Sequence, residues 1–270
     1  MIRQSLLSFT AALALSGPAF AEWQTQSQDE IVSVRMLEGW RLENGHHMAA
    51  LEITLADGWK TYWRAPGESG IPPVLSFSGA SGIDGMAIHW PAPQVFTING
   101  MRSIGYDGRV ILPLELLVDE TGEIQMDGEV ELGVCQDVCV PVTIDLEALL
   151  PPAGARPDPQ IVAALSDRPM TAHEAGASSA QCAIAPISDG MRVEVTLEMP
   201  PLGQAEAMVV EFPMPGVWVS EADMTRDGAR ITASADIVPP NSRPFALDRS
   251  SLRFTVIGSQ GAVELQGCSG

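Results

Sequence analysis

Two cysteines separated by three residues form the pattern in this chain that most directly predicts chemistry. Cys135 and Cys139 lie within residues 133–141, whose sequence is Gly-Val-Cys-Gln-Asp-Val-Cys-Val-Pro. A disulfide between them would close so short a loop that the chain-entropy estimate assigns it only about 2 kcal/mol of stabilisation. Strained or exposed disulfides exchange readily with thiols. From the residues alone, the pair is either a redox disulfide or a structural clip.

The segments on either side of the pair predict how it is positioned. Residues 129–132 and 140–146 alternate polar with apolar side chains, which is the period of a half-buried strand. A three-residue link between antiparallel strands is a common hairpin, and the residues that flank it face each other within disulfide range. We therefore expect a Cys135–Cys139 bond at the mouth of a β-hairpin. Asp137, inside the link, is either a turn residue or a charge that opposes thiolate formation.

The other two cysteines that follow residue 21, Cys182 and Cys268, are predicted to form a disulfide of the opposite character. Adjacent spacing pairs Cys135 with Cys139 and leaves these two as partners. Their loop is long, so its closure removes roughly 4–5 kcal/mol of unfolded-chain entropy. We expect this bond to be a structural staple. The sequence predicts no metal and no other cofactor, because no histidine has ligand spacing with a cysteine and two thiolates supply half of a tetrahedral site.

Short alternating segments with frequent turn signals predict an all-β fold. The strands expected before residue 150 are 31–38, 47–55, 74–78, 86–90, 110–118, 129–132 and 140–146. Pro113 interrupts one of them and predicts an edge or bulged strand there, because proline cannot donate to a ladder. Residues 96–105 are predicted to be a loop. The pattern favours a β-sandwich, with a Greek-key barrel as the other option.

Composition divides the chain into four parts. Residues 1–21 have the charge, apolar core and cleavage site of a secretory signal. Residues 22–150 form the first β-domain, and residues 151–181 are predicted to be a linker with a short helix that Asp158 caps. Residues 182–270 return to the strand pattern and are predicted to form a second, smaller β-domain with a packing or docking role.

The predicted signal and the charge of the chain limit where the protein acts and what it binds. Cleavage after Ala21 would export the mature chain to a compartment where disulfides persist. The formal net charge is −19, and Lys60 is the single lysine. This charge repels phosphate backbones, so nucleic-acid binding is disfavoured.

Aromatic residues are dense around the predicted first domain. They serve either as core or as an apolar cover over the cysteine hairpin, and the sequence leaves both open. The set comprises Trp59, Tyr62, Trp63, Trp90, Phe96 and Tyr106.

Several motifs together resemble the N-terminal periplasmic domain of the DsbD/ScsB thiol:disulfide interchange family. They occur in the family's order between residues 30 and 150, and the cysteine spacing is closer to the ScsB-like branch. The motifs are residues 58–73 (Gly-Trp-Lys-Thr-Tyr-Trp-Arg-Ala-Pro-Gly-Glu-Ser-Gly-Ile-Pro-Pro), 90–93 (Trp-Pro-Ala-Pro), 104–108 (Ile-Gly-Tyr-Asp-Gly), 112–113 (Leu-Pro) and 133–141.

The resemblance implies an immunoglobulin-like β-sandwich whose cysteine pair cycles between disulfide and dithiol. Cys135 and Cys139 match the family's redox pair, and we expect Cys139 to form the mixed disulfide with a partner. Phe96 matches the apolar tip of the loop that caps the pair in family members. Tyr62 and Trp63 match the aromatic residues that line the site.

The resemblance also implies partners and a location in the periplasm. We expect a thioredoxin-like periplasmic domain or a membrane electron-relay protein as the donor, supplied by separate proteins. The expected acceptors are periplasmic disulfide proteins, such as disulfide isomerases or proteins of cytochrome c biogenesis and copper tolerance. The alternative is a binding or chaperone-like β-sandwich in those pathways, in which the cysteine pair is purely structural.

Overall fold

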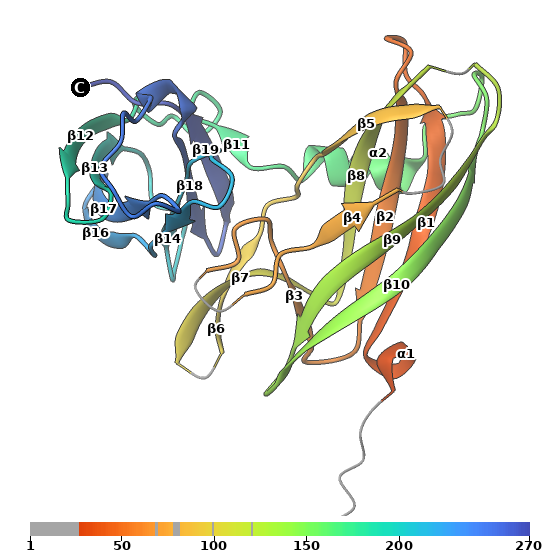
Figure 1. Ribbon diagram of the computed structural model, residues 1–270, viewed down its shortest axis with the longest axis horizontal. Coiled ribbons are helices and arrows are strands. Elements are labelled where there is room, and N and C mark those ends of the chain that lie inside the picture. Colours follow the sequence, from red (N-terminus) through yellow and green to blue (C-terminus); the bar gives the residue numbers. More distant parts are fainter. Residues whose placement is uncertain (1–26, 68–69, 78–81, 99, 120) are drawn as a thin grey trace, which may run out of the picture.

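A computed structural model describes residues 27–67, 70–77, 82–98, 100–119 and 121–270, so the predicted signal segment and its cleavage site lie outside the described residues. The chain forms an immunoglobulin-like β-sandwich and a second β-domain that lie side by side (Figure 1). The helix α1 (Gln28–Ile31) precedes the first strand. Within the described part of the chain, no helix has the length and apolar character needed to span a bilayer.

The first sheet of the sandwich follows the order β1-β2-β8-β5. Its centre is apolar because Leu51 and Ile53 of β2 and Leu112 and Leu114 of β8 are completely buried. The strands are β1 (Val32–Arg41), β2 (His47–Leu55), β5 (Ile83–Ile88) and β8 (Arg109–Val118).

The second sheet of the sandwich carries the cysteines and follows the order β10-β9-β3-β7-β6, with β4 beside β9. Its strands are β3 (Lys60–Tyr62), β4 (Val74–Ser76), β6 (Gln94–Ile98), β7 (Met101–Asp107), β9 (Ile124–Cys135) and β10 (Cys139–Leu150). The predicted cysteine hairpin is confirmed, since β9 and β10 pair in antiparallel register from Cys135 opposite Cys139 to Ile124 opposite Leu150.

Two local expectations were wrong. β8, which contains Pro113, is a central strand between β2 and β5. The Pro113 carbonyl accepts a hydrogen bond from the His89 N–H, one residue beyond the end of β5. In an antiparallel ladder the nitrogen and the carbonyl of one residue point to the same side, so the Pro113 nitrogen faces this side too. Because β5 has already ended there, the missing N–H removes no hydrogen bond from the ladder. Residues 96–105 do not form a loop, because β6 and β7 pair as a hairpin at the sheet edge.

The predicted helix in the linker is present as α2 (Pro159–Ser166). The Asp158 carboxylate caps it by accepting a hydrogen bond from the Gln160 N–H at 2.8 Å. Ile161 is completely buried and packs against the outer face of the first sheet, beside Leu37 and Ile111. The short strand β11 (Met170–Thr171) then pairs with the second domain. The boundaries of the linker and of the domains stay a prediction.

The second β-domain contains two sheets, of order β11-β19-β18-β14 and β12-β13-β17-β15, with β16 beside β17. Its core is separate, and Phe254 is its largest fully buried side chain. A Cys182–Cys268 disulfide joins β12 to the C-terminal segment. The further elements are β12 (Gln181–Pro186), β13 (Met191–Glu198), β14 (Ala207–Glu211), β15 (Trp218–Val219), β16 (Asp223–Asp227), β17 (Arg230–Val238), η1 (Arg249–Ser251), β18 (Arg253–Gly258) and β19 (Gly261–Gln266).

Candidate functional site

A disulfide joins Cys135, the last residue of β9, to Cys139, the first residue of β10. The two residues are direct partners in the ladder, with their Cα atoms 4.1 Å apart. Their surroundings differ, because Cys135 is completely buried whereas Cys139 is exposed. Of the two residues, Cys139 is therefore the one that a partner's thiolate or disulfide can approach.

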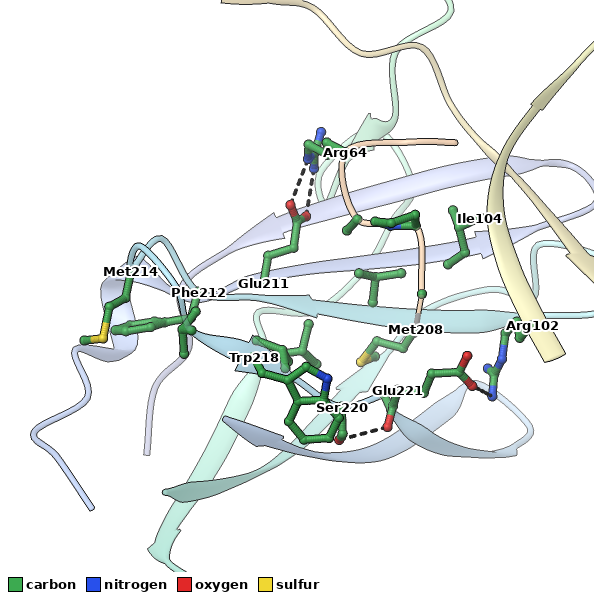
Figure 2. A pocket seen from close by; sticks show the side chains of 18 residues that line it. Arg64, Arg102, Ile104, Met208, Glu211, Phe212, Met214, Trp218, Ser220 and Glu221 are labelled. Carbon is green, nitrogen blue, oxygen red and sulfur yellow. Dashed lines mark hydrogen bonds and ion pairs between the residues drawn. The ribbon is translucent and has the colours of Figure 1, made fainter. Parts of the chain in front are cut away.

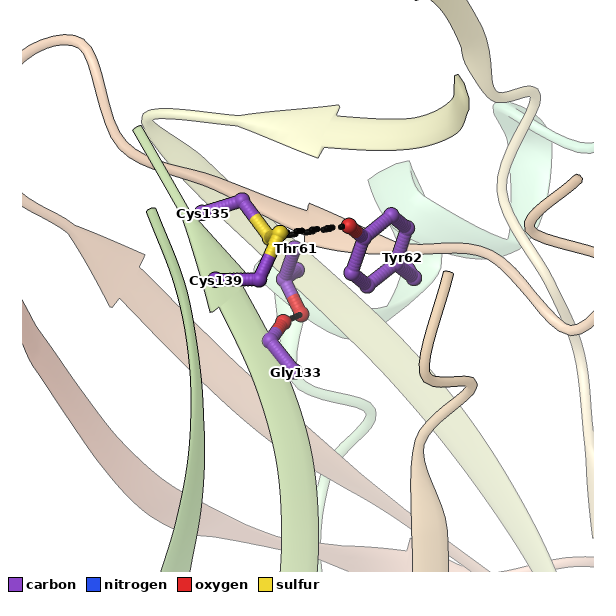
Figure 3. The surroundings of a disulfide bond; sticks show 5 residues. All are labelled: Thr61, Tyr62, Gly133, Cys135 and Cys139. Atoms are coloured by element: carbon purple, nitrogen blue, oxygen red, sulfur yellow. Dashed lines mark hydrogen bonds between the residues drawn. A yellow bond between two sulfur atoms is a disulfide. The ribbon is translucent and has the colours of Figure 1, made fainter. Parts of the chain in front are cut away.

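The Tyr62 hydroxyl contacts both sulfur atoms (Figure 3). Its oxygen lies 2.8 Å from the Cys135 Sγ and 3.1 Å from the Cys139 Sγ. The sulfurs of a disulfide carry no hydrogen, so the hydroxyl donates. Burial raises the pKa of the Tyr62 hydroxyl above its ordinary value, which keeps this donor protonated through neutral pH. After reduction, the same O–H is placed to stabilise a thiolate on Cys135.

Two glycines create the slot that the Tyr62 ring fills. A Cβ atom at Gly133 would lie 2.9 Å from the ring and 2.7 Å from the Ile71 Cβ, and a Cβ at Gly70 would lie 2.8 Å from the other edge of the ring. The Thr61 hydroxyl donates to the Gly133 carbonyl at 3.0 Å, which ties β3 to β9 next to the slot. Glycine is required at these positions because any side chain would displace the ring.

Phe96, the expected cap residue, is half-buried on the β6–β7 hairpin. The register places Gln94 opposite Gly105 and Gly105 opposite Tyr62, so Phe96, two residues after Gln94, shares the sheet face of Tyr62. Its role as a cap stays a prediction.

Lys60 is a site residue that the sequence reasoning missed. It is the direct ladder partner of Cys135 on β3, so the two side chains leave the same face of the sheet. Its ammonium group lies 5.3 Å from the centre of the Phe96 ring and donates to the Gly58 carbonyl. The sequence feature that could have identified it is that the chain's single lysine precedes Tyr62 by two residues. Lys60 thus contacts the ring of the expected cap residue, Phe96, and lies opposite the buried Cys135 in the sheet.

Trp63 is not placed at the sulfurs. Its side chain is completely buried in the core, and the Arg64 guanidinium stacks on its ring at 4.1 Å from the centre. Successive residues at this strand end point to opposite faces, so Tyr62 faces the disulfide and Trp63 faces away from it. Asp137 is exposed in the three-residue link, at the tip of the β9–β10 hairpin.

Two exposed apolar side chains form a rim beside the disulfide. Val138 is 70% exposed and lies between the cysteines. Ile71 is also exposed and lies against Gly133, two residues before Cys135. Val140 and Val74 are exposed farther away, because Val140 points to the other face of the hairpin and Val74 lies opposite Glu131. An apolar rim of this kind suits the surface of a protein partner more than a small polar molecule.

Three of the four histidines lie in or next to the first sheet and have partners of their own. His46 and His89 both contact the Glu115 carboxylate, at 2.6 and 3.0 Å, and His47 contacts the Glu38 carbonyl. Within the described ranges, no group of three or more His, Cys, Asp or Glu residues is arranged to hold a metal ion.

Comparison with known proteins agrees with this site. Residues 23–151 match the family described as "Thiol:disulfide interchange protein DsbD, N-terminal". A crystal structure of the N-terminal periplasmic domain of ScsB from Proteus mirabilis is similar over 92% of this chain and 97% of that chain, with a TM-score of 0.69 and 25% sequence identity. The search of curated proteins found no match.

The family match and the disulfide together support thiol–disulfide exchange as the general chemistry of this site. The similar ScsB domain is periplasmic, and domains of this family exchange electrons with thioredoxin-like partners. The part of this chain that spans residues 23–151 belongs to the family of DsbD N-terminal domains.

Proposed function

We propose that this protein is a periplasmic thiol–disulfide exchange module. In this proposal Cys135 and Cys139 cycle between disulfide and dithiol and pass reducing equivalents to periplasmic disulfide proteins. The observation that carries it is the asymmetry of the pair: Cys139 is exposed, Cys135 is buried, and the Tyr62 hydroxyl lies within hydrogen-bond distance of both sulfurs. A clip that only closed a turn would not require the buried donor.

In the reducing direction, Cys139 is the attacking residue. Its thiolate attacks one sulfur of a partner's disulfide, which forms a mixed disulfide and releases the partner's other sulfur as a thiolate. The Cys135 thiolate then attacks the Cys139 Sγ, closes the intramolecular bond and releases the second partner thiolate. Two electrons have moved to the partner, and the two protons lost by the cysteines are recovered by the partner's thiols.

Recharging follows the same path in reverse. A thiolate of a thioredoxin-like donor attacks the exposed Cys139 Sγ, and Cys135 departs as a thiolate. The Tyr62 hydroxyl donates to that departing sulfur at the position where charge develops. A second donor thiolate then resolves the mixed disulfide and leaves the pair reduced. The buried sulfur is thus the leaving group in one direction and the resolving nucleophile in the other.

The side chains around the pair fit docking by a protein. The rim of Ile71 and Val138 offers apolar contact beside the exposed sulfur. In this proposal Phe96, whose ring lies near the Lys60 ammonium group, covers the pair when no partner is bound. Such a cover would limit oxidation or reduction by small molecules.

Trapping of mixed disulfides tests the proposal. Cys135→Ser leaves Cys139 as a lone attacking thiol without its resolving partner, so the variant should accumulate covalent complexes with periplasmic proteins. Cys139→Ser leaves only the buried thiol and should accumulate far fewer. Dithiothreitol should also reduce the wild-type pair while the far-ultraviolet circular dichroism spectrum is retained. The alternative, a structural clip, predicts no covalent complexes from either variant and loss of the first domain's fold on reduction.

A further inference from the structure

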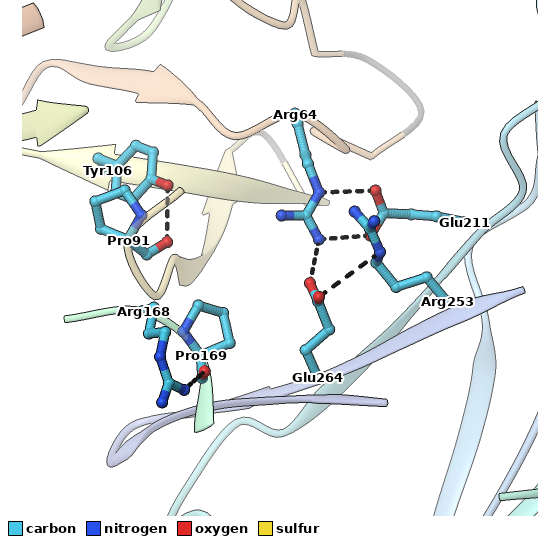
Figure 4. A network of polar contacts seen from close by, with 8 residues as sticks. All are labelled: Arg64, Pro91, Tyr106, Arg168, Pro169, Glu211, Arg253 and Glu264. Atoms are coloured by element: carbon cyan, nitrogen blue, oxygen red, sulfur yellow. Dashed lines mark hydrogen bonds and ion pairs between the residues drawn. The ribbon is translucent and has the colours of Figure 1, made fainter. Parts of the chain in front are cut away.

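The second domain is attached to the chain segment that follows Tyr62. The Arg64 guanidinium donates to both oxygens of Glu211 on β14, at 2.9 Å each, and to Glu264 on β19 at 2.6 Å (Figure 4). Arg64 is largely buried and stacks on Trp63. The end of β3 is therefore fixed against two strands of the second domain.

A second ion pair reaches the hairpin that carries Phe96. Arg102 on β7 pairs with Glu221, which lies between β15 and β16, at 3.2 Å (Figure 2). Arg102 is the ladder partner of Thr97, the neighbour of Phe96. Both charged side chains are about one-third exposed, at 34% and 30%. Such pairs contribute little and are screened by salt, so this contact can open and reclose easily.

Gly67 lies where the loop after β3, the β6–β7 hairpin and the second domain meet. Its φ of +92° lies in the left-handed region, and a Cβ there would lie 2.9 Å from the Arg102 carbonyl oxygen and 3.6 Å from the Glu221 carboxylate. The loop after β3, the β6–β7 hairpin and the second domain therefore approach one another closely at this residue.

Apolar packing and ion pairs both hold the hairpin to the second domain. Val209, Ile257 and Ala262 of the second domain join the core of the sandwich, and β18, which carries Ile257, packs against β6. The Arg64–Glu211 and Arg102–Glu221 pairs border a pocket, which Ile104, Met208 and Trp218 also line (Figure 2). Arg102 and Glu221 are more exposed than Arg64 and Glu211, so the Arg102–Glu221 pair is the weaker of the two and opens more easily.

The geometry points to a positioning role for the second domain. This inference rests on the function proposed above. We infer that the second domain holds the β6–β7 hairpin closed beside the disulfide, and that the Arg102–Glu221 pair is the latch. The contacts of Arg64 with Glu211 and Glu264 stay fixed when a partner docks, while the latch breaks and lets the hairpin move. The second domain thereby sets how readily a bulky partner reaches Cys139.

A charge-reversal cycle tests the latch. The four proteins are wild type, Arg102→Glu, Glu221→Arg and the double reversal, each as the full mature chain. The rate of reduction of the Cys135–Cys139 disulfide is measured with reduced thioredoxin, a bulky reductant, and with dithiothreitol, a small one. Each single reversal should raise the thioredoxin rate roughly two- to fivefold at low salt, with a smaller change for dithiothreitol. The double reversal should restore the wild-type ratio of the two rates.

A matched control separates the latch from general electrostatics. Arg230 and Glu198 form an ion pair within the second domain, at the opposite end of β17 from Asp236, whose backbone is hydrogen-bonded to Ser220 beside Glu221; the same reversals at Arg230 and Glu198 should leave the ratio of rates unchanged. If both single reversals at the latch leave the ratio unchanged, or the double reversal does not restore it, the inference is wrong while the proposed function stands. If neither reductant opens the wild-type disulfide in the folded protein, both are wrong.

Discussion

The hydroxyl of Tyr62 gives the sharpest prediction, because Tyr62→Phe removes one oxygen atom and leaves the ring in its slot. In the wild-type protein this oxygen lies 2.8 Å from the Cys135 Sγ and 3.1 Å from the Cys139 Sγ, and its single O–H donates to this disulfide. Reduction of the disulfide expels Cys135 as a thiolate in a completely buried position. The variant would have to develop that charge without its nearest donor.

The size of the effect follows from the strength of a hydrogen bond to a charged group, about 1.5–3 kcal/mol. Brønsted coefficients near 0.4–0.5 for thiol exchange indicate that about half of the charge is present in the transition state. The barrier should therefore rise by roughly 0.7–1.5 kcal/mol, which slows reduction roughly 3- to 12-fold. For the reduced protein, the full loss corresponds to a rise of about 1–2 units in the pKa of the Cys135 thiol.

Two measurements check these values. Stopped-flow reduction by dithiothreitol at pH 7 gives the rate, and the pH dependence of alkylation by iodoacetamide gives the thiol pKa of the reduced protein. Tyr106→Phe is a matched control, because Tyr106 is the chain's only other tyrosine and is equally buried. Its hydroxyl donates to the Pro91 carbonyl at 2.9 Å and not to sulfur.

Both phenylalanine variants lose one buried hydrogen bond, so both should lose about 1 kcal/mol in free energy of unfolding. Only Tyr62→Phe should change the reduction rate and the alkylation profile. Equal rates and profiles in the wild-type protein and Tyr62→Phe would refute the argument that this hydroxyl stabilises the departing thiolate. Equal slowing in both variants would attribute the effect to general loosening of the sandwich.

Three further predictions concern other parts of the molecule. Gly133→Ala should slow reduction about as much as Tyr62→Phe, because its Cβ would push the ring off the sulfurs. Loss of the Cys182–Cys268 disulfide by a double serine substitution should cost roughly 4–5 kcal/mol in urea unfolding of the second domain, since that bond closes a loop with a sequence separation of 86. Burial lowers the pKa of His47. The folded state therefore takes up fewer protons than the unfolded state as the pH falls below about 6.5, and stability is lost there. His47→Gln should remove that part of the pH dependence of the free energy of unfolding, which is at most about 1.4 kcal/mol per pH unit.

Each of these predictions has a contrary outcome, and the first two also have a control. Gly122→Ala introduces a Cβ with no neighbour within 4 Å and should leave the reduction rate unchanged; a normal rate in Gly133→Ala would contradict the slot. A double serine substitution at Cys135 and Cys139 should cost only about 2 kcal/mol, and an equal cost for both disulfides would contradict their division of roles. A wild-type pH slope in His47→Gln would remove His47 as the cause.

Local patterns determined the elements that carry the cysteines. Alternation of polar and apolar residues on both sides of residues 135–139 predicted the hairpin, its register and the short disulfide, because strand period and loop length are properties of consecutive residues. The same holds for the helix after Asp158, whose cap and first-turn proline are adjacent in the chain. The positions of Tyr62 and Phe96 came from resemblance and not from any local pattern.

Tertiary structure alone decided what surrounds the sulfurs and which side chains face them. Lys60 meets Cys135 because β3 pairs with β9, 75 residues further along the chain, and Trp63 is buried in the core instead of lining the site. Pro113 lies in a central strand because β5 ends opposite it. Contacts between residues far apart in sequence have no local signature, so the sequence determined the reactive pair, and tertiary packing decided that Cys135 is buried while Cys139 is exposed.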